Sequence, residues 1–382
     1  MRIAIEAQRL FREKKHGMDV VVLELIKNLQ QIDKVNEYFI LVKPDSDKCI
    51  SETENFRIIE LGGGPYPIWE QVALPRAAKK LKCDLLHCTS NTAPEMPGLP
   101  LVLTLHDIIY MEGGFFSLLK DKGTAYQRFG NVYRRHIVPI VVRKSARVIT
   151  VSEYEKERIA AFFKLEPSKL RAVYNGVGEH FKPITDPLVA QNIREKYHLP
   201  AHYFFFLGNT VQKKNTPGTL KAYSIFREKT GMDIPLMMLD FDLQDLTAIL
   251  AEIGQPGLIE HIHLTGYVNN AELPGIYGLA DLFLYPSFRE SFGIPILEAQ
   301  ACGTPVITSN TSSMPEIAGD AAMIIDPYKP EEIADAMIRL MKEDAYRQDM
   351  VRRGLVNASR FSWRAMAEKV LGIYEEVGRE VH

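Results

Sequence analysis

The sequence predicts an α/β protein with two domains in tandem, each built around a parallel β-sheet. Short apolar runs alternate with longer amphipathic stretches over most of the 382 residues, which is typical of βαβ units. A polar, proline-containing stretch at residues 177–200 separates two such series and is interpreted as a linker. The chain length fits two domains of roughly 100–200 residues each.

The first series of strands and helices precedes this linker. Residues 1–7 form its first predicted strand, and a polar stretch ending at Gly17 leads into a predicted helix at 20–29. Ser152 and Glu155 have the spacing of a capping box, so a helix is expected to begin there. The remaining strands are predicted at residues 38–42, 56–59, 85–87, 101–105, 147–151 and 173–176.

The second series follows the linker and repeats the same alternation. Its first strand is the apolar run YFFFL at residues 203–207. Further strands are predicted at 235–239, 261–264, 282–285, 306–308 and 322–325, separated by helices at 217–229, 246–253 and 330–341.

Composition and charge exclude several classes of protein. The formal net charge is −2, so no overall basic excess indicates a nucleic-acid partner. The four cysteines form no CxxC pair, which argues against a zinc or disulfide scaffold and favours a reducing compartment. The apolar runs are shorter than the ~20 residues that a membrane span needs. We therefore expect a cytoplasmic protein without a metal site.

Residues 286–305, PSFRESFGIPILEAQACGTP, carry the strongest chemical signal. Glu290 lies on a glycine-containing turn, and Pro295 is placed to open a helix that includes Glu298. The amides just before this helix, at Phe292–Ile294, are expected to face an anion or a hydroxyl of a ligand. Two carboxylates beside such amides suit a ligand with hydroxyls and phosphates. The alternative is that both glutamates are ordinary solvated charges.

Residues 208–215, GNTVQKKN, follow the strand YFFFL directly. Gly208 permits a close approach of the backbone, and Lys213 and Lys214 lie on the loop before the next helix. This arrangement suits a diphosphate at the carboxyl end of a parallel sheet. A solvated lysine pair is the alternative, and the loop is not a Walker motif because it lacks GK[ST].

His106 and Asp107 end the apolar run LVLTLHD. A histidine at a strand end can exchange a proton or hydrogen-bond a substrate hydroxyl. The alternative is a structural hydrogen-bonding pair.

Together these segments resemble the retaining glycosyltransferases of family 4, the "group 1" enzymes of the GT-B fold. The E-x7-E spacing of Glu290 and Glu298 is similar to that family's signature, and other matching segments occur in family order along nearly the whole chain. They are MRIAIEA, Gly17, WEQVALP at 69–75, LHD at 105–107, VITVSEYEKERI at 148–159, YNGV at 174–177, TGYV at 265–268 and SSMPEIAGDAA at 312–322.

The resemblance implies two Rossmann-like domains whose parallel sheets face a central cleft. It implies an acceptor domain at residues 1–180 and a nucleotide-sugar donor domain at 195–362. The last helix, 363–382, is then expected to cross back and pack on the first domain.

The resemblance also assigns roles to residues. His106, Lys214 and Glu290 are the expected catalytic group, with His106 near the C6 hydroxyl of the donor sugar and Glu290 facing the transferred sugar. Lys214 stabilises the leaving diphosphate, and Glu298 holds the ribose hydroxyls. The expected donor-binding set is Gly17, Gly208, Lys213, Lys214, Phe292, Gly293, Ile294 and Glu298.

The chain departs from the family pattern at several positions, and one of them is Lys213, where relatives usually carry an arginine. Asn209 stands where some relatives carry an arginine, which removes one phosphate contact. The loop at Gly17 continues with Met18 and Asp19 instead of a paired-glycine turn, and an inward Asp19 would repel a diphosphate.

The function implied is retaining, metal-independent transfer of a hexose, mannose among the candidates, without a cofactor. The donor is a GDP- or UDP-sugar, and the acceptor is a glycan or lipid-linked sugar in surface polysaccharide assembly. The alternatives are a non-catalytic nucleotide-sugar-binding scaffold, or another GT-B enzyme such as an epimerase or a phosphorylase. The basic segment 120–147 raises the hypothesis of peripheral contact with the inner face of the membrane, against the alternative of a solvated helix face.

Overall fold

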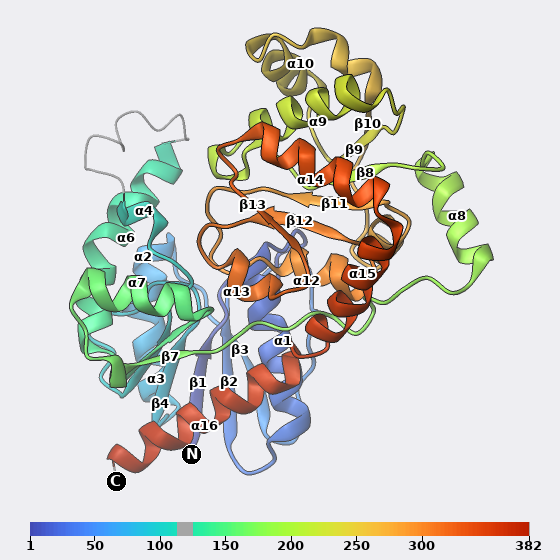
Figure 1. The fold of residues 1–382 in the computed structure, drawn as a ribbon. Helices are drawn as coiled ribbons and strands as arrows, with labels where there is room; N and C mark the ends of the chain where they lie inside the picture. Colours follow the sequence, from blue (N-terminus) through green and yellow to red (C-terminus); the bar gives the residue numbers. More distant parts are fainter. Residues whose placement is uncertain (113–124, 382) are drawn as a thin grey trace. The chain divides into compact units, whose positions relative to one another are not determined.

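The computed structural model describes residues 1–112 and 125–381, and it confirms an α/β fold with two parallel sheets (Figure 1). The chain divides into two compact units. The first contains Met1–Asn175 together with Trp363–His382, and the second is Gly176–Ser362. Lys120, within the basic segment noted above, lies outside the described residues.

The first unit is built on a seven-stranded, wholly parallel sheet. Its strand order is β3-β2-β1-β4-β5-β6-β7. Parallel strands are covered on both faces, which explains why they read as continuous apolar runs in the sequence. The strands are β1 (Arg2–Glu6), β2 (Glu37–Val42), β3 (Phe56–Glu60), β4 (Leu85–Cys88), β5 (Leu101–Thr104), β6 (Arg147–Thr150) and β7 (Leu170–Ala172).

Helices and helical turns connect these strands. The predicted cap is confirmed at α7, where the Ser152 hydroxyl accepts a hydrogen bond from the Glu155 amide at 3.2 Å. The described elements are α1 (Gly17–Ile32), α2 (Tyr66–Ile68), η1 (Trp69–Ala73), α3 (Leu74–Lys80), α4 (Ile109–Glu112), α6 (Ala125–Lys144), α7 (Glu153–Phe163), η2 (Pro167–Lys169) and α16 (Trp363–Val381).

The second unit has a six-stranded parallel sheet with the order β10-β9-β8-β11-β12-β13. Its centre is strongly apolar, and the Phe204–Phe206 strand is almost completely buried. The strands are β8 (Phe204–Phe206), β9 (Leu236–Leu239), β10 (Ile262–Thr265), β11 (Leu282–Tyr285), β12 (Val306–Ser309) and β13 (Met323–Ile325).

The helical elements of the second unit alternate with its strands. They are α8 (Pro187–Tyr197), η3 (Gln212–Lys214), α9 (Thr216–Thr230), α10 (Leu243–Glu252), η4 (Pro256–His261), α11 (Leu273–Gly278), α12 (Ile294–Ala301), α13 (Met314–Ala318), α14 (Pro330–Lys342) and α15 (Asp344–Ala358). The stretch interpreted as a linker, residues 177–200, contains α8. Among residues 1–112 and 125–381, no helix is both long enough and apolar enough to cross a bilayer.

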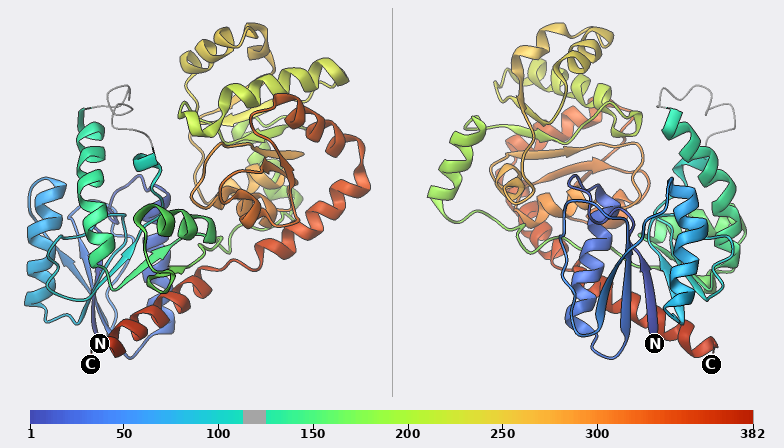
Figure 2. Two further views of the ribbon diagram at one scale, coloured as in Figure 1. Left: turned by 60° about the vertical axis from the view of Figure 1, so that its left-hand side comes forward. Right: turned by 180° about the vertical axis from the view of Figure 1, so that it is seen from behind.

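The last helix, α16, packs on the first unit (Figure 2). It lies against α1, and its Tyr374 hydroxyl is 2.6 Å from Nδ1 of His87 on β4. Arg147 on β6 forms ion pairs with Glu376 and Glu380 of the same helix. Burial lowers the pKa of His87 to about 3, so its imidazole is neutral and the contact with Tyr374 is an ordinary hydrogen bond.

We expect Tyr374→Phe to destabilise the protein by about 1–3 kcal/mol, because it leaves a buried His87 nitrogen without its partner. Chemical denaturation followed by tryptophan fluorescence measures this loss. The matched control is Glu368→Ala, which breaks an exposed i,i+4 ion pair with Arg364 on the same helix and costs less than about 0.5 kcal/mol. Equal losses in the two variants would contradict the anchoring role of Tyr374.

Candidate active site

Two loops of the second unit meet at the carboxyl ends of neighbouring strands. The β8–α9 loop and the β11–α12 loop follow strands that pair in parallel. The amide of Phe288 donates to the carbonyl of Lys213 at 2.8 Å, and the side-chain amide of Asn215 donates to the carbonyl of Pro286 at 3.0 Å. These bonds join the lysine-bearing loop to the glutamate-bearing loop, so the charged groups on the two loops are held together.

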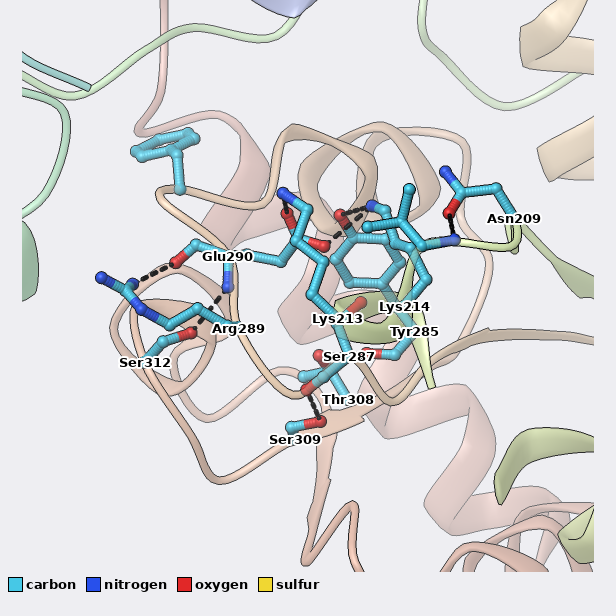
Figure 3. A network of polar contacts seen from close by, with 12 residues as sticks. Asn209, Lys213, Lys214, Tyr285, Ser287, Arg289, Glu290, Thr308, Ser309 and Ser312 are labelled. Carbon is cyan, nitrogen blue, oxygen red and sulfur yellow. Dashed lines mark hydrogen bonds and ion pairs between the residues drawn. The ribbon is translucent and has the colours of Figure 1, made fainter. Parts of the chain in front are cut away.

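Glu290 lies between the two lysines (Figure 3). Its Oε1 is 2.8 Å from Nζ of Lys214, and its Oε2 is 3.6 Å from Nζ of Lys213. The Glu290 side chain is 9% exposed and that of Lys214 is 15% exposed, whereas Lys213 is 35% exposed. The ion pair of Lys214 and Glu290 is thus largely buried, and Lys213 is the lysine more accessible to a ligand.

The protonation state of Glu290 follows from two opposing effects. Burial alone raises the pKa of a carboxyl group, but the nearby charges of Lys214 and Lys213 outweigh burial and hold the pKa of Glu290 below its usual value. Glu290 is therefore an ionised carboxylate at neutral pH. It can accept hydrogen bonds from hydroxyl groups, while the lysines can attract an anion.

The backbone around Glu290 is fixed from a third loop, between β12 and α13. The amide of Glu290 donates to the hydroxyl of Ser312 at 3.0 Å. The hydroxyl of Ser313 donates to the carbonyls of Glu290 and Phe292 at 3.0 and 2.9 Å. Ser312 and Ser313 begin the segment 312–322 that resembles the family's sequence, and their hydrogen bonds hold the backbone of the Glu290 loop in place.

Helix α12 begins at Ile294, one residue earlier than the proline-based prediction. Gly293 precedes it with a φ of 107°, a conformation that a residue with a side chain rarely adopts. Phe292 and Gly293 directly precede this helix and Ile294 is its first residue, so all three residues lie at its N-terminus. Gly303 has a φ of 77° just after the helix and supports the predicted C-terminal glycine.

Glu298 lies within α12 and is partly buried. One carboxylate oxygen accepts a hydrogen bond from the hydroxyl of Tyr277 at 2.8 Å. Burial raises the pKa of Glu298 to about 7, and the bond from Tyr277 offsets only part of that rise. A hydroxyl-rich ligand that donates further hydrogen bonds would stabilise the ionised form.

Gly208 lies just after β8 in a place that allows no larger residue. A β-carbon there would come within 2.2 Å of the ring of Phe206. A residue with a side chain there would displace the buried Phe206 ring, so glycine leaves the backbone of the loop uncovered at this point.

Gly17 and His106 belong to the first unit. Nε2 of His106 is 3.0 Å from the carbonyl of Thr89, which assigns the proton to Nε2. Burial lowers the pKa of His106, so the ring is neutral and Nδ1 is a hydrogen-bond acceptor. The backbone amide of His106 donates to the Asn91 side chain at 2.7 Å, which fixes the end of β5.

Gly17 is the first residue of α1. Near it, two contacts of Asp19 offset the negative charge that was expected to repel a diphosphate. One oxygen of Asp19 accepts from the amide of His16 at 3.0 Å, as an N-terminal cap. The other oxygen is 3.1 Å from Nε of Arg9. The charge of Asp19 is thus neutralised by Arg9 and the helix terminus. Apart from its chain neighbours and the backbone of its own helix, no atom of the described residues lies within 4 Å of the place where a Gly17 β-carbon would project.

Three residues that contact the site were not predicted as site residues from the sequence. Tyr285, Tyr277 and Asn215 each contact one of the predicted residues or join the two loops. Tyr285 is the last residue of an apolar strand immediately before the PSFRE motif, and its polar hydroxyl at that position was the available signal. In the described part of the chain no group of three or more histidine, cysteine or acidic side chains is arranged to hold a metal ion.

Solved structures place this fold in a known class. The chain superposes with a TM-score of 0.75 on a glycosyltransferase from Rickettsia africae ESF-5, at 18% sequence identity and with 98% of each chain covered. Anabaena Alr3699/HepE, crystallised with UDP and glucose, also gives 0.75 at 16% identity, covering 98% of this chain and 99% of its own. At these identities the likeness shows the fold, which is GT-B.

Sequence comparison identifies the family. The model "Glycosyl transferases group 1" matches residues 190–355, and the model "Glycosyltransferase Family 4" matches residues 16–180. The chain therefore belongs to the group 1, family 4 glycosyltransferases.

Individual relatives differ in how much of their length is matched. O-antigen chain mannosyltransferase B of Escherichia coli is 32% identical over 232 residues, which are 60% of each chain. A serotype-specific mannosyltransferase WbdA of Escherichia coli is 25% identical over 69% of this chain, but that match spans 32% of WbdA. D-inositol 3-phosphate glycosyltransferase of Corynebacterium glutamicum (strain R) is 24% identical, over 94% of this chain and 91% of its own length.

The raised pKa of Glu298 predicts a pH-dependent cost in stability. Below its ordinary pKa of 4.5 the residue is protonated in both the folded and unfolded states, and the cost is zero. Between pH 4.5 and about 7 the unfolded state ionises first, so the cost grows and then levels off. The substitution Glu298→Gln removes this cost in stability, because glutamine does not ionise, and its side-chain carbonyl can still accept the hydrogen bond from Tyr277. We expect the Glu298→Gln variant to gain stability over wild type from pH 5 to pH 8, by up to about 3 kcal/mol.

Thermal and urea unfolding of both proteins across this pH range measure the difference. Glu260→Gln, at an exposed position of the same unit, is the control and should show no trend with pH. A difference between Glu298→Gln and wild type that does not change with pH would contradict the assignment of a raised pKa to Glu298.

Proposed function

We propose that this chain is a retaining, metal-independent hexosyltransferase that takes its sugar from a nucleotide-diphospho-sugar. The observation that carries the proposal is the ionised Glu290 held between Lys213 and Lys214 on two joined loops. A pair of cations suits a diphosphate, and a carboxylate suits the hydroxyls of the attached sugar. The UDP complex of the Anabaena structure supports a nucleoside diphosphate ligand for this fold.

The second unit is proposed to bind the donor, and the first unit the acceptor. Glu298 accepts hydrogen bonds from the ribose hydroxyls, and the amides at Phe292–Ile294 bind sugar hydroxyls and phosphate. Gly208 allows the backbone of its loop to approach the diphosphate, and Gly17 does so from the first unit. These assignments rest on the family motif and on the contacts described above.

In the proposed reaction the bond between the anomeric carbon and the phosphate oxygen breaks, and negative charge develops on the leaving diphosphate. Lys214 and Lys213 are fixed cations that stabilise this charge where it develops. The acceptor hydroxyl attacks from the same face of the sugar, and its proton passes to the leaving phosphate. Configuration at the anomeric carbon is thereby retained.

His106 is proposed to act as a neutral hydrogen-bond acceptor. Because its proton lies on Nε2, held by the carbonyl of Thr89, Nδ1 can receive a hydrogen bond from the C6 hydroxyl of the donor sugar. This role needs no change in protonation of the ring.

Mannose from GDP-mannose is the first donor to test, since the two named mannosyltransferases of Escherichia coli are among the relatives. Glucose from UDP-glucose is the second. The proposed acceptor is a glycan or a lipid-linked sugar in surface polysaccharide assembly, reached at the cytoplasmic face of the membrane. Exposed Arg143 and Lys144 at the end of α6 supply positive charge for such a surface.

The proposal predicts that purified protein transfers hexose from GDP-mannose or UDP-glucose in the presence of EDTA, with an α-linked product detected by NMR. Lys214→Ala is expected to lower kcat about 10²–10³-fold, as when one stabilising donor is removed from a developing anion. The matched control is Lys229→Ala, which removes a lysine in an exposed ion pair with Asp335 and leaves kcat unchanged.

Four outcomes would contradict the proposal. A β-linked product would exclude retention, and loss of turnover in EDTA would exclude metal independence. Binding of a nucleotide-sugar without turnover against a panel of glycan and lipid-diphosphate acceptors would favour the non-catalytic scaffold. Strict dependence on inorganic phosphate would favour a phosphorylase instead.

A further inference from the structure

Tyr285 lies beneath the charged pair of the candidate site (Figure 3). It is the last residue of β11, it is 2% exposed, and its hydroxyl accepts a hydrogen bond from Nζ of Lys214 at 2.9 Å. The same ammonium lies 4.7 Å from the centre of the Tyr285 ring. One side chain thus holds Lys214 in two ways, through its oxygen and through the face of its ring.

We propose that Tyr285 is the positioning residue that fixes the ammonium of Lys214, and with it Glu290, in the geometry required for stabilising the leaving diphosphate. The inference rests on the function proposed above and deepens the description of that site. Tyr285 itself does not touch the substrate in this account, because its hydroxyl is covered by the lysine that it holds.

The need for such a residue follows from the flexibility of lysine. A lysine side chain has four carbons and a freely rotating ammonium, and it lacks the rigid planar fork of arginine. An ammonium stabilises a transition state well only when it is already aimed at the developing charge. The ion pair with Glu290 alone does not supply this, since Glu290 is also shared with Lys213.

The surroundings of Tyr285 make it a stiff support. Its ring is packed against that of Phe283 on the same strand, with the centroids 5.7 Å apart. Its backbone carbonyl accepts a hydrogen bond from the hydroxyl of Thr308 on β12 at 2.9 Å. Burial, and then the charge of Glu290, hold the pKa of Tyr285 well above its usual value. The phenol therefore keeps its proton and is a neutral group beside Lys214 and Glu290.

The sharpest test is a double-mutant cycle between Tyr285→Phe and Lys214→Ala. Phenylalanine keeps the ring and removes the hydroxyl. If Tyr285 acts through Lys214, Tyr285→Phe lowers kcat about 10- to 100-fold in the wild-type background, with KM for the donor little changed. In the Lys214→Ala background the same substitution has no further effect on kcat. Equal effects in the two backgrounds would overturn the proposal.

A second buried tyrosine separates positioning from general stability. Tyr203 lies in the same unit, and its hydroxyl donates to the carbonyl of Ile276 at 2.7 Å. Tyr203→Phe should lower the unfolding temperature about as much as Tyr285→Phe does while leaving kcat near that of wild type. A fall in kcat that tracks the unfolding temperature in both variants would mean that Tyr285 is merely structural.

A measurement without substrate keeps this inference separate from the proposed function. Limited acetylation followed by fragment mass spectrometry reports how well each lysine is held. Acetylation of Lys214 is expected to increase several-fold in Tyr285→Phe, with Lys229, which pairs with Asp335, as the internal reference, and to stay unchanged in Tyr203→Phe. Unchanged reactivity of Lys214 in Tyr285→Phe would overturn the inference, whereas an inactive wild type with this increase would overturn only the proposed function.

Discussion

The ion pair between Lys214 and Glu290 is the interaction on which the candidate site depends. Two opposite charges taken out of water are costly unless each compensates the other and the surrounding groups hold them in place. Here the pair lies 2.8 Å apart, and Lys213 adds a second positive charge at 3.6 Å. The three charges leave a net positive site that is stable without a ligand and still attracts an anion. A diphosphate brings the negative charge that this arrangement lacks.

The fold supplies the rigidity that this arrangement needs. Strands β8 and β11 are neighbours in the sheet, so the loops that follow them emerge at the same edge. Asn215 ties these loops together through the carbonyl of Pro286 and also binds the carbonyl of Pro327 at 2.8 Å. Ser312 and Ser313 then fix the backbone at Glu290 from the β12–α13 loop. Four loops thus determine the placement of a few charged atoms.

The sequence predicted the two parallel sheets because buried strands read as apolar runs, and its motifs led to Lys214 and Glu290. It missed α8 because the prolines of the 177–200 stretch were interpreted as helix breakers, whereas Pro187 occupies the first helical position, where proline is favoured. Tyr285 was missed because a tyrosine at the end of an apolar strand resembles core. The partner of Glu298, Tyr277, comes from a different helix, and no local pattern links such distant residues.

The most direct test of this account is calorimetric titration of the protein with UDP, GDP, ADP and CMP, each with and without EDTA. The account predicts that one nucleoside diphosphate binds selectively, that EDTA leaves its affinity unchanged, and that Glu298→Ala abolishes the binding. Absence of binding by all four nucleotides, or equal binding by wild type and Glu298→Ala, would contradict the assignment of this site. The family membership would then describe the fold of the chain without its chemistry.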